Sequence, residues 1–268
     1  RGVLGSRGLG DVYKRQVKKN TIMKVEVTII IAAYNAETTI ERALKSVKSQ
    51  NFENWECLII DGASKDKTIE IVQTIIKSDS RFQLFSEPDK GVYDAFNKGW
   101  RLAHGDWIYY LGCDDELLPN GISALMDCTS NVDFVYGGII RRYRNGKTKK
   151  APAGVFEKSM PYSLAASHQA MLMKKNIIER VGGFKLKYKI LADYDLINNA
   201  YYCGIKTRRC NEYIAIFQLG GLSTDNISSL KERYEILVSY KVNKNRAFFH
   251  CLKMGFLFCL YKIKHRYF

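Results

Sequence analysis

The adjacent carboxylates Asp114 and Asp115 are the residues whose types and spacing most clearly suggest chemistry. They follow the apolar segment 107–111, which has the length of a buried strand. Two neighbouring carboxylates repel one another, and a bound cation relieves that repulsion. Hard oxygen ligands favour Mg²⁺ or Mn²⁺, which proteins usually bind together with substrate phosphates. The alternative is a helix N-terminus, where the helix dipole also favours acidic side chains, and the pair alone does not decide between the two.

Three further polar clusters follow apolar segments in the same manner. They are Ala33–Tyr34–Asn35, Asp61–Gly62–Ala63–Ser64 and Glu87–Pro88–Asp89–Lys90–Gly91. Residues of these types also form turns, which is the simpler interpretation of any single cluster. In open parallel α/β sheets, ligands bind beyond the carboxyl ends of the strands. Four polar clusters at such ends therefore predict a ligand site along one edge of a sheet.

The elements expected to position these clusters alternate between strand and helix. Apolar segments rich in β-branched residues predict strands at 25–32, 56–60, 82–86 and 107–111. Helical periodicity predicts helices at 37–50, 66–77 and 92–103. This alternation predicts a mostly parallel sheet with right-handed crossovers.

After Pro119 the pattern becomes less regular. We expect a strand at 134–143 that turns at Asn145–Gly146 and pairs with 147–151. Helices are expected at 121–128, 176–181 and 194–202. The arrangement predicts one α/β domain over 23–225 and a helical extension over 226–268. Residues 1–16 show no hydrophobic periodicity, and 11–16 read like a translated adaptor sequence, so we expect a non-native leader over 1–22; a short disordered native tail is the alternative.

The overall charge leaves several classes of partner open. The formal net charge of +15 suits nucleic acid, an anionic membrane surface or anionic ligands, and a generally basic surface is as good an explanation. The predicted strands end in acidic residues, which repel phosphate in the absence of a metal, so we expect no nucleic-acid partner. The seven cysteines include no CxxC pair, which gives no support for a zinc site. Scattered reduced thiols suit the cytoplasm.

Residues 28–119 resemble the core of glycosyltransferase family 2, which has the GT-A fold. The matching segments are 30–35, 59–68, 86–99 and 105–108, then Ser167–His168–Gln169 and the stretch from Gly182 to Asp195. Several linked motifs in the right order are more specific than any one of them. The resemblance implies an α/β, Rossmann-like sheet, mostly parallel and flanked by helices, with the C-terminal helical extension beyond it.

The resemblance implies a donor site for a nucleotide-sugar. Tyr34 would stack on the base, and Asp61 would accept hydrogen bonds from the base or ribose. The implied donor-binding set is Ala33, Tyr34, Asn35, Asp61, Lys90 and Asp114, with a solvated surface lysine as the alternative for Lys90. Asp114 and Asp115 would hold the ribose and the Mg²⁺ or Mn²⁺ that bridges the diphosphate. Gly112 stands where the family usually has an acid or Asn, which leaves the main metal ligand open.

The resemblance also implies a general base. Asp193 matches the second acid of the family's Glu-Asp motif, with Ala192 in place of the Glu, and could take the proton of an acceptor hydroxyl. Asp195 is the rival, and a role for Asp193 as a helix N-cap is the alternative. Candidate acceptor or phosphate contacts are His168, Gln169 and Asp195, although a lone histidine is more often a structural hydrogen-bonding residue.

The expected activity is an inverting, metal-dependent transfer of a hexosyl or N-acetylhexosaminyl group, with UDP as the favoured nucleotide. The acceptor would be a saccharide or a lipid-linked molecule in cell-envelope polysaccharide synthesis. One alternative is a nucleotidyltransferase, but the first strand lacks the glycine-rich basic loop that such enzymes usually need. Another is a nucleotide-sugar-binding protein without catalysis, although Asp61, Asp114, Asp115 and Asp193 are all retained.

The C-terminal segment 248–268 mixes apolar and aromatic residues with basic ones. Its uninterrupted apolar run, 254–261, is too short to span a bilayer. The composition fits a basic amphipathic segment on an anionic membrane, which predicts a cytoplasmic enzyme bound peripherally to the inner face of the plasma membrane. A helix packed on the domain is an equally good interpretation.

Overall fold

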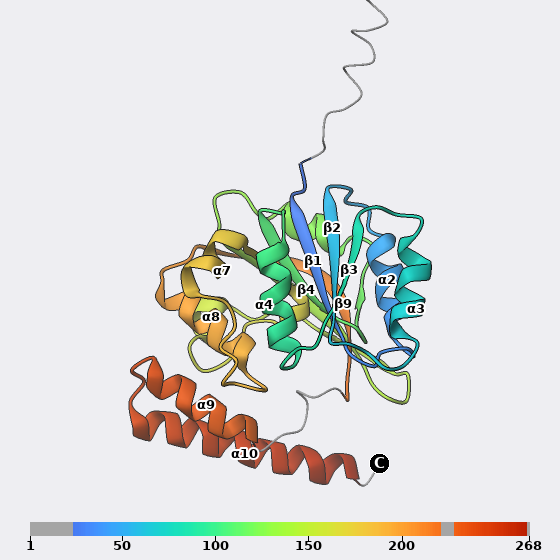
Figure 1. Cartoon of the computed structure of the whole chain (residues 1–268). Helices are drawn as coiled ribbons and strands as arrows, with labels where there is room; N and C mark the ends of the chain where they lie inside the picture. Colours follow the sequence, from blue (N-terminus) through green and yellow to red (C-terminus); the bar gives the residue numbers. More distant parts are fainter. Residues whose placement is uncertain (1–23, 221–227, 267–268) are drawn as a thin grey trace, which may run out of the picture.

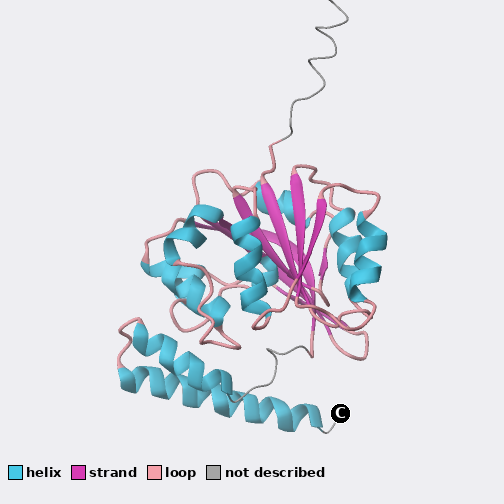
Figure 2. Ribbon diagram, viewed as in Figure 1, coloured by secondary structure: helices cyan, strands magenta, loops and turns pink. Residues whose placement is uncertain are grey.

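The computed structural model describes residues 24–220 and 228–266. In these residues nine strands form a single sheet, and helices cover both of its faces (Figures 1 and 2). The strand order is β3-β2-β1-β4-β8-β6-β9-β5, with β7 beside β6. The leader expected at 1–22 and the domain boundary expected at 225 lie outside the described residues.

The first half of the chain forms the parallel part of the sheet. Its strands are β1 (Val27–Ala33), β2 (Trp55–Asp61), β3 (Phe82–Ser86) and β4 (Trp107–Gly112). The helices that connect them are α2 (Ile40–Lys48), α3 (Thr68–Ile76) and α4 (Val92–Leu102). All three pairings among these strands are parallel, as predicted. Because β1 lies between β2 and β4, the strand order reverses at β1 and β4, where open sheets place their ligands.

The two faces of β1 explain why both sides of the sheet carry helices. Ile29 and Ile31 are fully buried in one apolar cluster together with Leu44 of α2. Ile30, between them, points the opposite way and is buried with Phe96 of α4. Successive side chains of a strand alternate between faces, so a strand that is apolar on both faces requires a helical layer on each side.

The second half of the chain adds mainly antiparallel pairings. Its strands are β5 (Glu116–Leu117), β6 (Phe134–Arg142), β7 (Thr148–Ala151), β8 (Met171–Lys174) and β9 (Thr207–Gln218). Its helices are α5 (Gly121–Met126), α6 (Phe156–Ser159), the 3₁₀ turn η1 (His168–Ala170), α7 (Lys175–Val181) and α8 (Ala192–Tyr202). The predicted hairpin is confirmed, because β6 and β7 pair antiparallel on either side of Asn145–Gly146.

Strands β8 and β9 were not predicted, and both are important for the site. β8 pairs antiparallel with β4 and β6, and so joins the two halves of the sheet. β9 runs parallel to β6 and antiparallel to β5. The end of β9 is thereby brought next to the turn that carries the acidic pair.

The C-terminal extension forms the helices α9 (Ser228–Ser239) and α10 (Lys244–Arg266). The two helices lie side by side at the end of the molecule toward which β1 runs (Figure 1). Ile236, Leu237 and Ala247 are buried in the same apolar cluster as Tyr194 of α8, so the extension packs against the domain. None of the helices in the described part of the chain combines the length and apolarity needed to cross a membrane.

Candidate functional site

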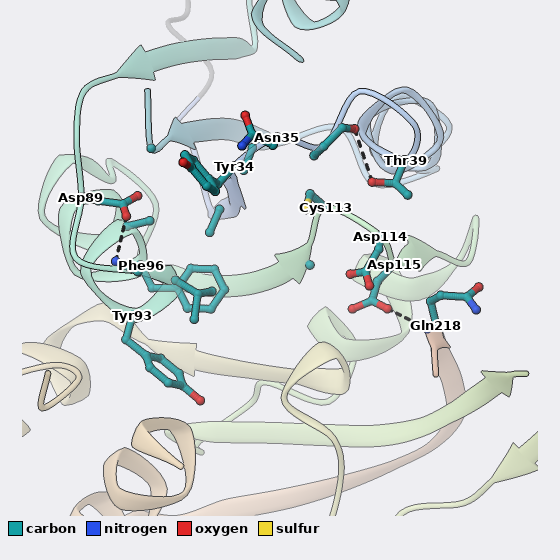
Figure 3. Close-up of a pocket in the computed structure, with 18 of the residues that line it drawn as sticks. Tyr34, Asn35, Thr39, Asp89, Tyr93, Phe96, Cys113, Asp114, Asp115 and Gln218 are labelled. Atoms are coloured by element: carbon teal, nitrogen blue, oxygen red, sulfur yellow. Dashed lines mark hydrogen bonds between the residues drawn. The ribbon is translucent and has the colours of Figure 1, made fainter. Parts of the chain in front are cut away.

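A cavity with a volume of about 730 Å³ lies at the carboxyl ends of the parallel strands. All four predicted polar clusters contribute to its walls (Figure 3). It is lined by 32–36, 38–39, Gly62, 88–89, 91–93, 95–96, 112–115, 168–169, 189–190 and 217–218. A largely apolar cavity with a few convergent polar groups is typical of a small-molecule site.

The turn after β1 presents Tyr34 to this cavity. Its ring is 62% exposed, although most aromatic side chains of the domain are buried. The next residue, Asn35, adopts the left-handed conformation with φ of +49°, which asparagine tolerates better than most residues. The Asn35 backbone N–H donates to Ser64 Oγ at 2.9 Å, and its side-chain oxygen accepts from the Lys65 N–H at 2.9 Å. These hydrogen bonds join the turn after β1 to the turn after β2 and keep the Tyr34 side chain exposed to the cavity.

Asp61 and Lys90, two of the residues expected to bind the nucleotide, do not line the cavity. Asp61 is fully buried, and its carboxylate accepts hydrogen bonds from the Ser64 N–H, the Ser64 hydroxyl and the Ser86 hydroxyl. Lys90 is exposed, and its backbone N–H donates to Asp94. Asp61 thus organises the turn that places Gly62 in the wall, and a direct nucleotide contact for either residue stays a prediction.

The acidic pair lies in a turn that leads into a strand. The element that follows is β5, so the interpretation of Asp114 and Asp115 as a helix N-terminus is wrong. Asp115 is 1% exposed. Its Oδ1 accepts the backbone N–H of Gln218 at 2.8 Å, whereas its Oδ2 is buried and has no hydrogen-bond partner among the described residues. A buried charged oxygen without a partner is unfavourable, so in the described part of the chain Asp115 Oδ2 lacks the donor or cation that would stabilise its charge.

The pKa values of both carboxyls reflect this environment. Burial and, to a lesser extent, the neighbouring charge of Asp114 raise the pKa of Asp115 to about 6, and they outweigh the opposing effects of Gln218, His168 and Gln169. Burial also raises the pKa of Asp114, with the positive charge of Arg42 acting in the opposite direction. A bound cation would favour the ionised form of both groups.

The absence of a side chain at Gly112 lets the two carboxylates converge. A Cβ atom at this position would lie 2.6 Å from Asp115 Oδ2 and 2.9 Å from Asp114 Oδ1. The two oxygens therefore flank one point, and they can be no farther apart than the sum of these distances. Two hard oxygens, one of them without a hydrogen bond, fit Mg²⁺ or Mn²⁺ if phosphates and water supply the remaining ligands. Within 24–220 and 228–266, no cluster of three or more His, Cys, Asp or Glu side chains could hold a metal.

An arginine pair supports the same turn and could not be recognised from the sequence. Arg42 of α2 donates to the Asp114 carbonyl at 2.9 Å and forms an ion pair with Glu116 at 2.8 Å. Arg142, at the end of β6, forms a second ion pair with the same Glu116 oxygen. The three residues lie far apart in the chain, and only the sheet topology brings them together. Gln218 was missed for the same reason.

Asp193 lies one layer behind the cavity wall. Its Oδ2 is 3.3 Å from His168 Nδ1, and its Oδ1 accepts the Tyr194 N–H at 2.7 Å and lies 3.4 Å from the Tyr93 hydroxyl. His168 and Tyr93 line the cavity, whereas Asp193 does not. The N-cap of α8 is Leu191, so the interpretation of Asp193 as the N-cap is wrong.

Interactions with Asp193 favour protonation of His168. Burial lowers the pKa of His168, but the hydrogen bond and charge of Asp193 outweigh this, and Asp115 and Asp114 add to the effect. The net result is a raised pKa for His168. The raised pKa favours the cationic form of this imidazole, which would suit an anionic ligand.

The remaining two candidates differ in position. Gln169 lines the cavity, and its side-chain oxygen accepts a hydrogen bond from Ser167. Asp195 is 1% exposed, lies outside the cavity lining and pairs with Lys185 Nζ at 3.1 Å and the Tyr240 hydroxyl at 3.2 Å. These contacts give Asp195 a structural role in the described residues, and its expected role as a ligand contact or rival base stays a prediction.

Comparison with known sequences gives consistent matches. Residues 28–194 match the family model described as Glycosyl transferase family 2. A PGL/p-HBAD biosynthesis glycosyltransferase from Mycobacterium bovis is 29% identical over 204 residues, which cover 73% of this chain and 78% of that protein. The GalNAc(5)-diNAcBac-PP-undecaprenol beta-1,3-glucosyltransferase of Campylobacter jejuni is 25% identical over 228 residues, covering 80% and 72% of the two chains.

Solved structures show the same fold. TarS of S. aureus, residues 1–349 in complex with UDP-GlcNAc, superposes with a TM-score of 0.62 at 15% identity, covering 83% of this chain and 69% of that one. The mannosyltransferase PcManGT of Pyrobaculum calidifontis, in complex with GDP-Man and Mn²⁺, gives a TM-score of 0.58 at 20% identity, covering 84% and 67%. These structures are GT-A glycosyltransferases, so the fold predicted from the sequence is confirmed.

Proposed function

The chain belongs to glycosyltransferase family 2, and from this premise we propose that it is an inverting, metal-dependent transferase. It transfers a hexosyl or N-acetylhexosaminyl group from a UDP-sugar to a saccharide or lipid-linked acceptor in cell-envelope polysaccharide synthesis. The observation that carries the proposal is the acidic turn, in which Asp114 and Asp115 converge above Gly112 and one buried oxygen lacks a partner.

In this proposal the acidic turn would bind Mg²⁺ or Mn²⁺ together with the donor. When bound, the ion supplies Lewis-acid assistance to the departing nucleoside diphosphate. The residues that hold it are Asp114 and Asp115, which Arg42 and Gln218 keep in place. Tyr34 stacks on the base from the exposed turn after β1. A structural relative in complex with UDP-GlcNAc supports UDP as the nucleotide, and one in complex with GDP-Man makes GDP the alternative to test.

Asp193 is the proposed general base. It takes the proton of the acceptor hydroxyl as that oxygen attacks the anomeric carbon, and a single in-line displacement inverts the configuration. The Asp193 side chain is 16% exposed, and its Oδ2 lies 3.3 Å from His168 Nδ1, so in this proposal the acceptor hydroxyl approaches the carboxylate beside His168. Protonated His168 is then free to contact a donor phosphate.

The proposed acceptor site is close to a membrane. The Campylobacter jejuni relative is named for an undecaprenol-linked acceptor. In this chain α10 exposes Phe248, Phe249, Leu252 and Phe256 on one side, and its sequence contains basic but no acidic residues. An apolar face with only positive charges fits the surface of an anionic bilayer. We therefore place the enzyme on the cytoplasmic face of the plasma membrane, held peripherally.

The membrane proposal is tested by sedimentation with vesicles. The wild-type protein should bind vesicles of phosphatidylglycerol and phosphatidylcholine more strongly than vesicles of phosphatidylcholine alone. Replacing Phe248, Phe249, Leu252 and Phe256 together by serine should abolish binding, because it removes the exposed apolar face without changing charge. Equal sedimentation of variant and wild type would exclude α10 as the anchor.

Thermal unfolding with nucleotides tests the donor site. UDP, GDP and dTDP are each added with Mn²⁺ or with EDTA, because a ligand that binds only the folded state raises its apparent stability. We expect a Mn²⁺-dependent rise with UDP that is lost in Asp114→Ala/Asp115→Ala. The control is Asp106→Ala, which removes an exposed carboxylate at the opposite edge of the sheet. No shift with any nucleotide, from folded protein, would overturn the proposal.

Two assays separate the alternatives. UDP binding without release of UDP from UDP-glucose or UDP-GlcNAc, with any of a panel of acceptors, would indicate a binding protein without catalysis. Release of pyrophosphate from a nucleoside triphosphate and a sugar phosphate would indicate a nucleotidyltransferase.

A further inference from the structure

The C-terminal helix α9 reaches the cavity wall through one side chain, Glu232. Its Oε1 accepts the backbone N–H of Lys189 at 2.7 Å. Its Oε2 accepts the N–H of Ile190 at 3.0 Å and the N–H of Leu191 at 2.8 Å. One carboxylate therefore binds three consecutive backbone donors more than 40 residues away in the sequence.

These three donors precede the first turn of α8, which lacks a cap of its own. The N-cap residue is Leu191, whose side chain cannot accept a hydrogen bond. Backbone N–H groups at a helix start have no partner within the helix, and the helix dipole favours an anion there. Hydrogen bonds to a carboxylate are stronger than those to a neutral acceptor. Glu232 thus binds the segment that leads into α8, including the N–H of its N-cap residue Leu191, from another helix.

The capped segment belongs to the cavity and leads directly to the proposed base. Lys189 and Ile190 line the cavity, and the Ile190 carbonyl accepts the Tyr93 hydroxyl at 2.7 Å. Asp193 follows two residues after Leu191, and its Oδ1 lies 3.4 Å from the same hydroxyl. A shift of 189–191 would therefore move both the cavity wall and Asp193.

Helix α9 is itself held firmly against the domain. Arg233, next to Glu232, donates to the Tyr162 carbonyl at 3.0 Å, and its guanidinium lies 4.6 Å from the centre of the Tyr194 ring. Ile236 and Leu237 are fully buried. Glu232 is thus presented from a fixed support and does not follow the segment if that segment moves.

We propose that Glu232 is a positioning residue for sugar transfer, which makes the C-terminal helices part of the active site. It fixes the backbone of 189–191 and, through it, the place of Asp193 relative to the donor. Glu232 lies outside the segment that matches the family, 28–194, so the site extends beyond the shared core. The inference rests on the proposed function, because it assigns Glu232 a role in that reaction.

The test uses Glu232→Gln in the full chain. Glutamine keeps the size of the side chain but loses the charge and replaces one acceptor oxygen by a donor. Glu235→Gln is the matched control, since Glu235 is exposed on the same helix and forms no hydrogen bond or ion pair with other described residues. Glu232→Asp keeps the charge on a shorter side chain, so its amide exchange rates and its kcat should lie between those of Glu232→Gln and the wild type.

Hydrogen exchange and turnover are measured on each variant. The amides of Lys189, Ile190 and Leu191 should exchange at least about tenfold faster in Glu232→Gln and unchanged in Glu235→Gln. UDP release from UDP-GlcNAc and UDP-glucose with Mn²⁺ should show kcat lowered by about 10- to 100-fold, with KM for the donor changed less than about twofold. The thermal shift given by UDP and Mn²⁺ should be unchanged.

Different results would remove different parts of the argument. Unchanged exchange in Glu232→Gln, or a wild-type kcat despite faster exchange, overturns the positioning role. Loss of the UDP shift together with kcat also overturns it, because the defect would then be general. If the wild type binds no nucleotide, the proposed function fails and the role of Glu232 in transfer fails with it. If the amides of 189–191 nonetheless exchange faster in Glu232→Gln, Glu232 would keep only a structural role.

Discussion

Two buried carboxylates at opposite edges of the same sheet have contrasting environments. Glu56, at the start of β2, is 4% exposed and accepts hydrogen bonds from the Thr28 hydroxyl at 2.7 Å and the His104 N–H at 2.6 Å, with His104 Nδ1 at 2.9 Å. Burial opposes its ionisation, but these hydrogen bonds outweigh burial and lower its pKa. Asp115, beyond the end of β4, is as deeply buried, but its Oδ2 has no hydrogen-bond partner among the described residues, and its pKa is raised to about 6.

The difference separates a structural from a functional use of the same chemical group. At the amino edge the chain supplies enough donors for the ionised carboxylate, so Glu56 ties β1, β2 and the segment before β4 together. At the carboxyl edge the chain leaves Asp115 incomplete, although further donors would be easy to supply. Unfavourable burial of this kind is typical of sites that a ligand completes.

The largest expected effect concerns the functional edge. Asp115→Ala should reduce UDP release from UDP-GlcNAc by about 10³-fold, or about 4 kcal/mol in transition-state stabilisation. Asp114→Ala should reduce UDP release less than Asp115→Ala does. Asp115 is almost fully buried and one of its oxygens lacks a partner among the described residues, so we expect it to be the main ligand. The measurement is kcat/KM as a function of Mn²⁺ concentration for each variant. A larger loss in Asp114→Ala would make Asp114 the main ligand.

The next largest effect concerns the structural edge. Glu56→Ala should lower the free energy of unfolding by about 3 kcal/mol, because it removes the acceptor of the buried Thr28 hydroxyl and of the His104 N–H. The kcat per folded molecule should not change. Denaturant unfolding together with titration of active sites checks both parts. A variant as stable as wild type would show that the two edges do not differ as described.

Asp115→Asn should stabilise the folded protein, in contrast to Glu56→Ala. In EDTA at pH 7 we expect it to raise the free energy of unfolding by roughly 1–3 kcal/mol, since a pKa raised from 3.8 to about 6 corresponds to about 3 kcal/mol at most. The same variant should lose the stabilisation by UDP and Mn²⁺. A neutral or destabilising substitution would contradict the claim that the buried charge is unfavourable without a cation.

The pH dependence of this gain follows from the raised pKa. Between about pH 4 and pH 6, folded Asp115 binds more protons than the unfolded chain does, so the free energy of unfolding falls as pH rises through this window. The difference between Asp115→Asn and wild type should therefore be absent near pH 4 and complete by pH 7. Glu56 has the opposite sign: its contribution is present above its ordinary pKa of 4.5 and is lost as pH falls.

The smallest effect is expected at His104, whose side chain is 70% exposed. His104→Ala removes the ring contact with Glu56 but keeps the backbone N–H, so stability should fall by less than about 1 kcal/mol. Denaturant unfolding beside Glu56→Ala measures it. A loss as large as that of Glu56→Ala would mean that the ring, and not the backbone, completes the carboxylate.

The sequence predicted the parallel half of the molecule because its signals are local. Apolar strands and amphipathic helices alternate there, and each strand starts or ends within two residues of its expected bounds. The four polar clusters could be placed at one edge for the same reason. The Tyr34 and Asp114 turns therefore lie together in the structure as expected.

The rest depends on contacts between distant parts of the chain. β9 has no clear alternation of polar and apolar residues, so neither the strand nor the hydrogen bond from Gln218 to Asp115 could be predicted. Glu232 is one acidic residue on a helix with several charges, and only the packing of α9 gives it three backbone donors. The serine partners of Asp61 could not be assigned from spacing alone, so its part in holding the turn after β2 was not predicted.

The hydrogen bond from Gln218 to Asp115 also has a consequence for synthesis of the chain. Its two residues are 103 positions apart, and ribosomes add roughly 5–20 residues per second. On the order of 5–20 seconds therefore pass after Asp115 is made before its partner exists. During that time a nascent chain can assemble β1 to β4, but its acidic turn lacks the hydrogen bond from the β9 backbone, and the segment 189–191 lacks Glu232 of α9. The proposed active site is thus among the last parts of the protein to form.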